Sequence, residues 1–569
     1  MTGMVLAFSI LMLPQIIRIM KNCKIHISTI LVMLTSVLFI ITACKEEEDF
    51  PRTRLFSPVL NEELYSVDNT IIVNMAKMKQ AISYTLEVSR DTFKTIDYTI
   101  ETDTNYIVIN GELAGEELLW FTYYQVRATA HADDSEYDSK PANLGSVRTQ
   151  KYPSNMGTPS SFDVLDTQAR VFWTTTGNPV TDIKVFALSD VRLVNPLLTF
   201  EVTPEQQAEA EAIIYGLAPS TQYYIAIYSE DQVRGWEAYT TRPPLVSGDN
   251  VINLAGYIAP LGDTLADLEN GSIVLLEGGR TYTTGGYIFD KSITFMSGYS
   301  FVPALPLIDC TSNFAIAGDV RVDSIVFREI AFSGDFASRY VFNPQISSPS
   351  AFNVGEIKFV SCRIRELRGV TRLRGLGNLE KYTIIDCVID SIADYAILTL
   401  DTDLGVAVGD ITFKNSTFSK CHQFLTVRTN SNSVLIEDCT ISEVPTTDQK
   451  MFRWRGGDGN NNVANGITIR NVIWGHAWDR NTTGGYAARG DDGGTSLDNT
   501  TFIIVNTYST SLFSFVVGYE IPGFPVGNYT GTSTDLWTNP LAGVDFSFLD
   551  MGFAGKNDCG DPRWRPGRR

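Results

Sequence analysis

The sequence predicts an all-β protein in which a parallel β-helix follows two β-sandwich modules. Short alternating apolar segments separated by turn residues fill residues 55–150 and 153–243. After residue 250, apolar segments recur at similar spacing, which is typical of a solenoid. Within this repeating part no stretch has the periodicity of an amphipathic helix.

The composition is that of an acidic globular protein. The 569 residues are 44% hydrophobic and 19% charged, with a formal net charge of −20. This balance argues against nucleic acid as a partner, because general nucleic-acid affinity needs a basic footprint. Beyond His26 in the leader, the histidines are His131, His422 and His476, and their wide separation argues against a histidine-rich metal site.

The N-terminal segment predicts export from the cytoplasm. Lys21 and Lys24 precede the apolar run "IHISTILVMLTSVLFII", and small residues follow it up to Cys44. A basic segment, an apolar segment and small residues in this order describe a secretory signal. The alternative is that the same run forms a transmembrane anchor.

The end of this signal resembles a bacterial lipobox. The residues are Ile41-Thr42-Ala43-Cys44, and the resemblance implies that Cys44 is lipidated and becomes the mature N-terminus. The following "KEEED" (45–49) is similar to the acidic export signal of Bacteroidetes surface lipoproteins. We therefore expect a signal peptide over 1–44, in which Met20 is the true translation start, followed by an acidic tether over 45–54. The protein would then be an outer-membrane lipoprotein that faces the outside of the cell.

The two sandwich modules resemble fibronectin type III domains. In the second, Leu217-x-Pro219-x-Thr221-x-Tyr223 is similar to the tyrosine corner, in which the Tyr hydroxyl bonds to nearby backbone. The first has a weaker version at 120–130, without the proline. The resemblance implies spacing or protein contact and no chemistry. "TTRPPLVSGDN" (240–250) reads as the linker to the next domain.

From residue 250 to 545 we expect the β-helix, with a C-terminal tail over 546–569. One apolar block recurs in steps of 23 to 33 residues, at 325–332, 357–364, 382–389, 411–418, 434–441, 467–474 and, more loosely, 495–502. A second strand repeats in steps of 27, at 369–375, 396–402, 423–429 and 450–456. A constant step with variable loops elsewhere predicts stacked coils; a propeller needs about 40 residues per unit.

The 27-residue register sorts the side chains of the second strand into two faces. An apolar set should fill the interior: Leu373, Leu400, Val427 and Trp454, with Leu398, Leu425 and Phe452 two residues earlier. Trp454 is thus predicted to be a core residue rather than a sugar-stacking platform. The opposite set points outward: Arg372, Thr399, Thr426 and Arg453, then Arg374, Asp401, Arg428 and Arg455.

The same reasoning places several cysteines inside. Cys362, Cys387 and Cys439 share one column of the first block with Ser416. We expect stacked buried thiols. A disulfide between Cys362 and Cys387 on neighbouring coils is the alternative.

The outward charged column has two interpretations. Residues 357–381 hold seven basic and two acidic side chains, against the sign of the whole chain. Coils about 4.8 Å apart place Arg374 and Arg428 beside Asp401. The arginines then form either a surface ion ladder, which contributes little to stability, or a groove for an anionic polymer whose carboxylates accept bidentate hydrogen bonds.

Residues 270–545 resemble the pectin-lyase-like right-handed β-helix, with "GSIVLLEGGRTYTTGGYIFDKSITFMSG" (271–298) similar to its first coils. The whole plan, including the ending "GDPRW" (560–564), resembles lipoproteins of Bacteroidetes polysaccharide-utilisation loci. The resemblance implies handling of pectin-like glycans, and proteins of a glycan-uptake system as partners.

The resemblance does not identify catalytic residues in this chain, because the WxDH and RxPxxR motifs of pectate lyases are missing from the sequence. Asp401 and Asp403 would hold Ca²⁺ in a lyase, with Arg428 or Arg455 as the base. Asp458 in "GGDGNNN" is a further candidate for Ca²⁺, although such residues more often form turns. Hydrolases of this fold, the polygalacturonases, need several aspartates and a Gly-His-Gly element. Aspartates are present within 401–403 and 491–492, but the sequence has no Gly-His-Gly.

The leading prediction is a surface lipoprotein whose β-helix binds an acidic, uronate-rich polysaccharide without cleaving it. The substrate-binding residues are then Arg372, Arg374, Asp401, Arg428, Arg453 and Arg455. A calcium-dependent polysaccharide lyase is the second hypothesis, and a structural or adhesive surface protein is the third.

Overall fold

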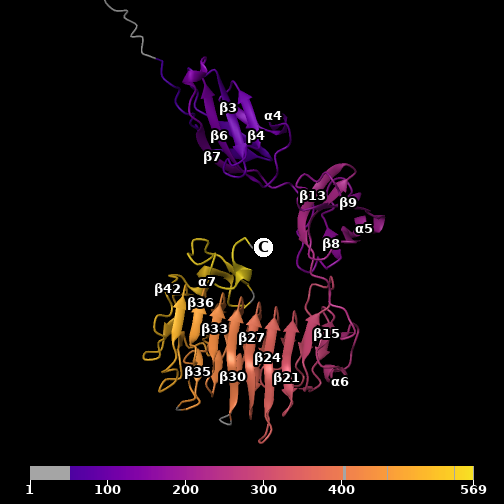
Figure 1. Ribbon diagram of the computed structural model, residues 1–569, viewed down its shortest axis with the longest axis vertical. Helices are drawn as coiled ribbons and strands as arrows, with labels where there is room; N and C mark the ends of the chain where they lie inside the picture. Colours follow the sequence, from indigo (N-terminus) through magenta and orange to yellow (C-terminus); the bar gives the residue numbers. More distant parts are fainter. Residues whose placement is uncertain (1–51, 402–404, 458, 544, 568–569) are drawn as a thin grey trace, which may run out of the picture. The chain divides into compact units, whose positions relative to one another are not determined.

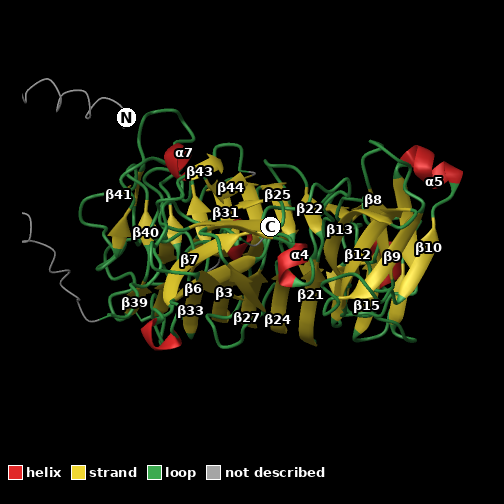
Figure 2. Cartoon of the chain, turned by 90° about the horizontal axis from the view of Figure 1, so that it is seen from above, coloured by secondary structure: helices red, strands yellow, loops and turns green. Residues whose placement is uncertain are grey.

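A computed structural model describes residues 52–401, 405–457, 459–543 and 545–567. The signal segment with Cys44, and Asp403 and Asp458 of the predicted calcium sets, lie outside the described residues. The chain divides into two compact units, 1–152 and 153–569. Strands dominate both (Figures 1 and 2), which confirms the all-β class. In the described part of the chain no helix is long and apolar enough to cross a membrane.

The first unit contains a seven-stranded antiparallel sandwich. One sheet has the order β1 (Tyr65–Val67), β2 (Thr70–Asn74), β5 (Tyr106–Ile109). The other has the order β4 (Tyr98–Thr102), β3 (Ser83–Ser89), β6 (Tyr123–His131), β7 (Ala142–Arg148). Every second residue of β6 is buried, as alternation predicts for a strand with one face in a core. The short elements α4 (Gly111–Ala114) and η1 (Ser135–Tyr137) lie in connections.

The second unit begins with a sandwich of the same kind. Its larger sheet has the order β10 (Leu198–Glu201), β9 (Asp182–Ala187), β12 (Gln222–Ser229), β13 (Gln232–Thr240). Its smaller sheet pairs β11 (Glu211–Tyr215) with β8 (Gln168–Phe172), and α5 (Pro204–Glu209) precedes β11.

Both modules contain a tyrosine corner. In the second, the Tyr223 hydroxyl accepts a hydrogen bond from the backbone N–H of Ala218 at 3.0 Å. In the first, the Tyr124 hydroxyl accepts one from the N–H of Leu119 at 2.9 Å. The spacing is five residues in both, so the corner forms in the first module without a proline. This agrees with the fibronectin type III-like assignment of both modules.

The rest of the second unit is a parallel β-helix, as predicted (Figure 1). It has three long sheets. The first sheet runs β14 (Val251–Asn253), β15 (Ser272–Leu276), β18 (Ile293–Ser297), β21 (Arg321–Arg328), β24 (Phe352–Val360), β27 (Gly377–Ile385), β30 (Val406–Lys414), β33 (Ser433–Glu437), β36 (Ile467–Arg470), β39 (Phe502–Val505). The second runs β16 (Thr281–Thr283), β19 (Leu307–Asp309), β22 (Ala331–Ser333), β25 (Arg363–Leu367), β28 (Val388–Ile392), β31 (Thr417–Cys421), β34 (Thr440–Ser442), β37 (Ile473–Trp474), β40 (Tyr508–Ser509), β42 (Gly527–Asn528).

The third sheet contains the strands with the 27-residue step. It runs β23 (Tyr340–Phe342), β26 (Gly369–Leu373), β29 (Leu398–Leu400), β32 (Leu425–Val427), β35 (Phe452–Trp454). Thr399 pairs with Thr426, and Thr426 with Arg453, so the predicted register is confirmed. The inward set is fully buried, and Trp454 has 0% exposure, as expected for a core residue. Two short parallel pairs, β17 (Ile288–Phe289) with β20 (Ala315–Ile316) and β38 (Ala487–Ala488) with β41 (Ser514–Phe515), complete the coils.

The turn between the first and second sheets has the same backbone conformation in successive coils. From β21 onward, seven successive coils have one non-glycine residue at this turn in the left-handed region, with φ between 50° and 55°: Glu329, Ser361, Asp386, Asn415, Asp438, Asn471 and Asn506. Asn and Asp tolerate this conformation better than other non-glycine residues.

The column after this turn contains the predicted stacked cysteines. Cys362, Cys387, Ser416 and Cys439 are buried, and the three cysteines are free thiols. Stacking is therefore confirmed, and the alternative disulfide between Cys362 and Cys387 does not form in this structure.

The C-terminal segment covers the outer face of the second sheet. It contains α7 (Ser533–Leu536), β43 (Trp537–Asn539), β44 (Asp545–Phe548) and η2 (Pro562–Trp564). Its residues form a small core with Ile473 of β37. Asp561 accepts a hydrogen bond from Thr417 Oγ1 at 2.7 Å, and Trp564 Nε1 donates to the same oxygen at 2.7 Å. The expected boundary at 545/546 falls inside β44.

Candidate functional site: the arginine face

The predicted binding residues gather on the outer face of the third sheet. We call this surface the arginine face and define it by Arg372, Arg374, Asp401, Arg428, Arg453 and Arg455. Arg372 lies in β26 and Arg453 in β35, and the others directly follow β26, β29, β32 and β35. The sheet register therefore places them in two adjacent outward columns.

Asp401 bridges two arginines of this face. Arg372 donates from Nε to Asp401 Oδ2 at 2.9 Å, and its terminal nitrogen bonds to the same oxygen. Arg428 lies 3.9 Å from the other oxygen, Oδ1. The sequence predicted Arg374 as the first partner; the structure uses Arg372, one column away, because its side chain reaches diagonally across the coil.

Burial alone would lower the pKa of Arg372, but the hydrogen bond and charge of Asp401 outweigh it and the pKa is raised. The Arg372 guanidinium also lies 4.2 Å from the ring centroid of Tyr395. These contacts hold it in one orientation.

Two further carboxylates repeat the bridging pattern. Asp492 lies 3.3 Å from Arg453 and 3.8 Å from Lys450. Asp394 lies 3.6 Å from Arg368 and 3.3 Å from Arg480. Each of these carboxylates is thus shared by two cations, so the surface keeps an excess of positive charge. The partners in variable loops have no fixed repeat position, and the sequence did not reveal them.

Three more arginines belong to this excess. Within the described residues, Arg374, Arg455 and Arg489 have no carboxylate at ion-pair distance. The Nε atoms of Arg374 and Arg489 are buried without a hydrogen-bond partner. Because no described carboxylate neutralises them, these guanidiniums can pair with an anionic ligand.

The electrostatic surroundings of Arg374 and Arg455 agree with this. Burial, followed by the neighbouring charge of Arg372, lowers the pKa of Arg374. Burial, followed by Arg453 and Arg428, lowers the pKa of Arg455. An anion placed between these cations would relieve their mutual repulsion.

The candidate metal ligands are only partly placed. Asp403 and Asp458 lie outside the described residues. Both oxygens of Asp401 face arginines. Among the described side chains, no three His, Cys, Asp or Glu residues are grouped closely enough to hold a metal ion. Of the acids considered for hydrolysis, Asp492 is bound by Arg453 and Lys450, and burial raises the pKa of Asp491.

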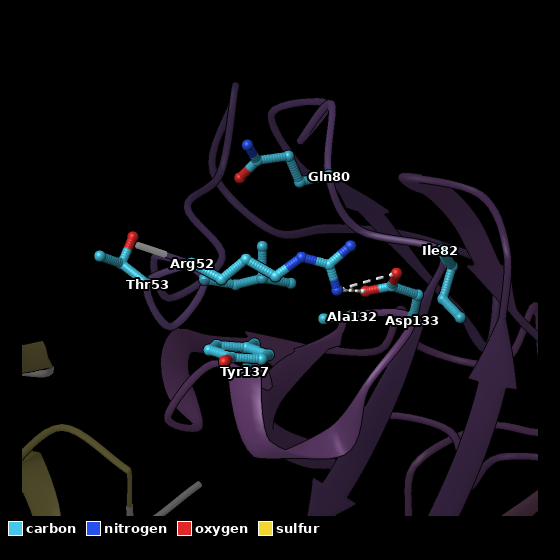
Figure 3. Close-up of a pocket in the computed structure, with 8 residues that line it drawn as sticks. Arg52, Thr53, Gln80, Ile82, Ala132, Asp133 and Tyr137 are labelled. Atoms are coloured by element: carbon cyan, nitrogen blue, oxygen red, sulfur yellow. Dashed lines mark hydrogen bonds and ion pairs between the residues drawn. The ribbon is translucent and has the colours of Figure 1, made fainter. Parts of the chain in front are cut away.

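A separate pocket of about 460 Å³ lies in the first module (Figure 3). Arg52 crosses it and donates to both oxygens of Asp133 at 3.1 Å, with Tyr137 and Gln80 nearby. Both charged side chains are more than half exposed, at 64% and 62%, so the pair contributes little. No nucleophile lines the pocket beside a base, and we assign no chemistry to it.

No family model matches this sequence, and no curated protein matches it. Similar solved structures include the FN1–FN3 domains of chicken CNTN1, at 12% identity and a TM-score of 0.15, covering 33% of this chain and 69% of that one. Another is the central fibronectin III array of RIM-binding protein, at 14% identity and a TM-score of 0.12, covering 33% and 62%. These scores are too low to carry an argument. The fold and site define a parallel β-helix protein with two fibronectin type III-like modules and a cationic outer face.

Proposed function

We propose that this chain is a surface lipoprotein whose arginine face binds an acidic, uronate-rich polysaccharide. The supporting observation is that cations outnumber carboxylates on this face of a chain whose net charge is −20. Coils about 4.8 Å apart repeat the guanidiniums along the helix axis. Such a row suits a polymer with a carboxylate on successive units, since each guanidinium offers two parallel donors.

The location belongs to the same proposal. A lipid on Cys44 would anchor the chain in the outer membrane, and the two modules would space the β-helix from the surface. A glycan held there would be passed to partner proteins of an uptake system. Mass spectrometry of the membrane-extracted protein tests the anchor: a diacyl or triacyl mass on Cys44 is expected, and an unmodified Cys44 would contradict it.

Affinity electrophoresis of residues 45–569 in gels containing polygalacturonate tests the binding. We expect retardation that falls with added salt, because counterions compete for the guanidiniums. Replacing both Arg374 and Arg455 with Ala should weaken binding roughly tenfold or more, since a charge-assisted hydrogen bond contributes about 1.5–3 kcal/mol. Arg470→Ala is the matched control, because Arg470 lies in β36 of the first sheet and is bound to Glu437. Unretarded wild-type protein, or equal loss in the control, would contradict the proposal.

Calcium-dependent β-elimination is the second candidate. The supporting observation is the lowered pKa of Arg455, which is the direction a guanidinium base requires. Incubation with polygalacturonate and Ca²⁺ would then produce the ultraviolet absorbance of an unsaturated uronate, and this should disappear in Arg455→Ala. A flat trace would leave binding without cleavage. A structural role is the third candidate and is less favoured, because it expects every outward arginine to be paired.

A further inference from the structure

The last coil of the β-helix ends in an open strand edge. β39 is the terminal strand of the first sheet, and within the described residues it pairs only with β36. Its outward side chains Ile503 and Val505 are 47% and 51% exposed. A terminal strand presents unpaired N–H and C=O groups along its free side, which makes it a template for another strand.

The interior of the β-helix is closed at both ends. At the N-terminal end, α6 (Leu261–Leu265) buries Leu261 and Leu265 completely in the main core. At the C-terminal end, Ile521 and Phe524 fill the interior of the last coil. The final segment with α7 packs with Ile473 of the second sheet instead of over β39. The interior is therefore closed while the strand edge stays available.

The chain segment that contains β39 is also nearly free of charge. Residues 499–519 contain no Asp, Glu, Lys or Arg, and Glu520 is the single charged residue between 499 and 534. In a chain with 19% charged residues, a stretch of this length would ordinarily carry several. Exposed edges are usually protected by charges, prolines or bulges, and β39 contains neither a charge nor a proline.

We propose that β39 pairs with β39 of a second copy of this chain, antiparallel and about a two-fold axis, so that the two first sheets become continuous. A second copy fits this edge for an electrostatic reason. Two chains of charge −20 repel each other over most approaches, but pairing through β39 brings no charged residues of the two strands together.

The two-fold arrangement also satisfies both backbones at once, because an antiparallel pair of identical strands exchanges N–H···O=C bonds reciprocally. Ile503 and Val505 of one copy then lie beside those of the other as cross-strand apolar pairs. Val517 and Val526, 90% and 62% exposed in neighbouring parts of the same coil, would lie near the rim of this contact.

Sedimentation equilibrium of residues 45–569, from low micromolar to about 100 µM, tests the proposal, since a Kd in this range corresponds to a weak specific interface. We expect a monomer–dimer equilibrium. Ile503→Lys should abolish the dimer by placing two ammonium groups across the axis. Ile213→Lys is the matched control: Ile213 is 43% exposed on β11, itself an edge strand, and this variant should dimerise like wild type.

Hydrogen exchange keeps the proposal testable if Ile503→Lys misfolds. In the wild-type protein, amides of β39 should exchange more slowly as concentration rises, while those of β11 should not change. Val505→Lys, checked for folding by circular dichroism, is the second variant. A monomer at every concentration, a dimer without added β39 protection, or a folded Lys variant that still dimerises would each overturn the inference.

Discussion

The outer faces of the second and third sheets belong to the same coils but have different surroundings. On the second sheet, the column Thr417, Thr440 and Ile473 is at most 1% exposed, because the C-terminal segment lies over it. On the third sheet, the side chains of Arg372 and Arg453 are 17% and 22% exposed and end among other charges. One face carries short polar and apolar residues that pack, and the other carries long cations.

This difference separates two tasks within a single repeat. The coil geometry determines the position of each outward side chain. The residue type at that position determines whether the column is covered by another segment or remains an exposed binding surface. The covered face should therefore determine stability and the arginine face should determine ligand binding. Substitutions on the two faces test this division.

The largest effect is expected from removing an aromatic side chain of the covering segment. Trp537 is fully buried and packs 5.2 Å from Phe546, centroid to centroid. Trp537→Ala should lower the free energy of unfolding by about 3–5 kcal/mol through lost burial and the cavity it leaves. Urea denaturation measures this. Arg455→Ala on the arginine face should change the free energy of unfolding by less than about 0.5 kcal/mol. A loss as large as that of Trp537→Ala would show that the arginine face also determines stability.

The next effect is a pH dependence at the rim of the covered face. Glu443 is 9% exposed, and burial raises its pKa to about 7, only partly offset by Lys420. The folded protein then binds more protons at Glu443 than the unfolded chain does between the ordinary pKa of 4.5 and about 7. This contribution to stability is complete below the ordinary value and is lost as pH rises through about 7, by roughly 2–3 kcal/mol.

Glu443→Gln should remove this loss, so the difference in unfolding free energy between variant and wild type should grow from pH 4.5 to 7.5. Glu437→Gln is the matched control. Glu437 is similarly buried, but bonds from Arg470 and Lys414 overcome its desolvation and lower its pKa. Its contribution is present above the ordinary value and is lost only at lower pH, so the Glu437→Gln difference should stay flat from pH 4.5 to 7.5 while the Glu443→Gln difference grows. Parallel pH profiles would show that neither carboxyl behaves as described.

The fold was predictable from the sequence to the extent that it repeats. The 27-residue step correctly predicted the pairing of Thr399 with Thr426 and the burial of Trp454. The tyrosine corner located one strand in each sandwich. The C-terminal cover was not predicted, because its contacts join Thr417 to Asp561, 144 residues apart, and follow no periodicity.

The candidate site was predictable in composition but not in connectivity. The outward column followed from alternation, yet the partner of Asp401 was assigned to Arg374 instead of Arg372. The strand register determines the positions of the Cα atoms, whereas a long arginine side chain can reach a carboxylate in its own column or in the neighbouring one. Asp394, Arg480 and Asp492 lie outside the 27-residue repeat, so only the tertiary structure brings them to this face.

A smaller effect should follow from releasing the arginines that Asp401 holds. Asp401→Asn removes the carboxylate shared by Arg372 and Arg428 and leaves both guanidiniums available. If the arginine face binds an anionic polymer, affinity for polygalacturonate should rise by a few-fold, about 1 kcal/mol, in the electrophoretic assay. If Asp401 instead holds calcium for a lyase, the same variant should lose calcium-dependent activity. Weaker binding without any activity to lose would refute both roles.

The last comparison concerns the interior cysteine column at the turn between the first and second sheets. Cys387 Sγ donates to the Ile385 carbonyl and accepts the N–H of Cys362 at 3.3 Å. One coil later, Ser416 Oγ makes the same two bonds, to the Lys414 carbonyl and from the N–H of Cys387. Cys387→Ser should therefore reproduce its neighbour and change the unfolding free energy by less than about 1.5 kcal/mol, as near-isosteric swaps do.

Cys387→Ala gives the contrast, because it leaves the buried N–H of Cys362 without an acceptor and should cost about 1–3 kcal/mol. Urea denaturation under reducing conditions measures both variants. Equal costs would mean that the column packs by volume alone. A larger cost for Ser would mean that the thiol contributes something a hydroxyl cannot replace, even though Ser416 occupies the equivalent position in the next coil.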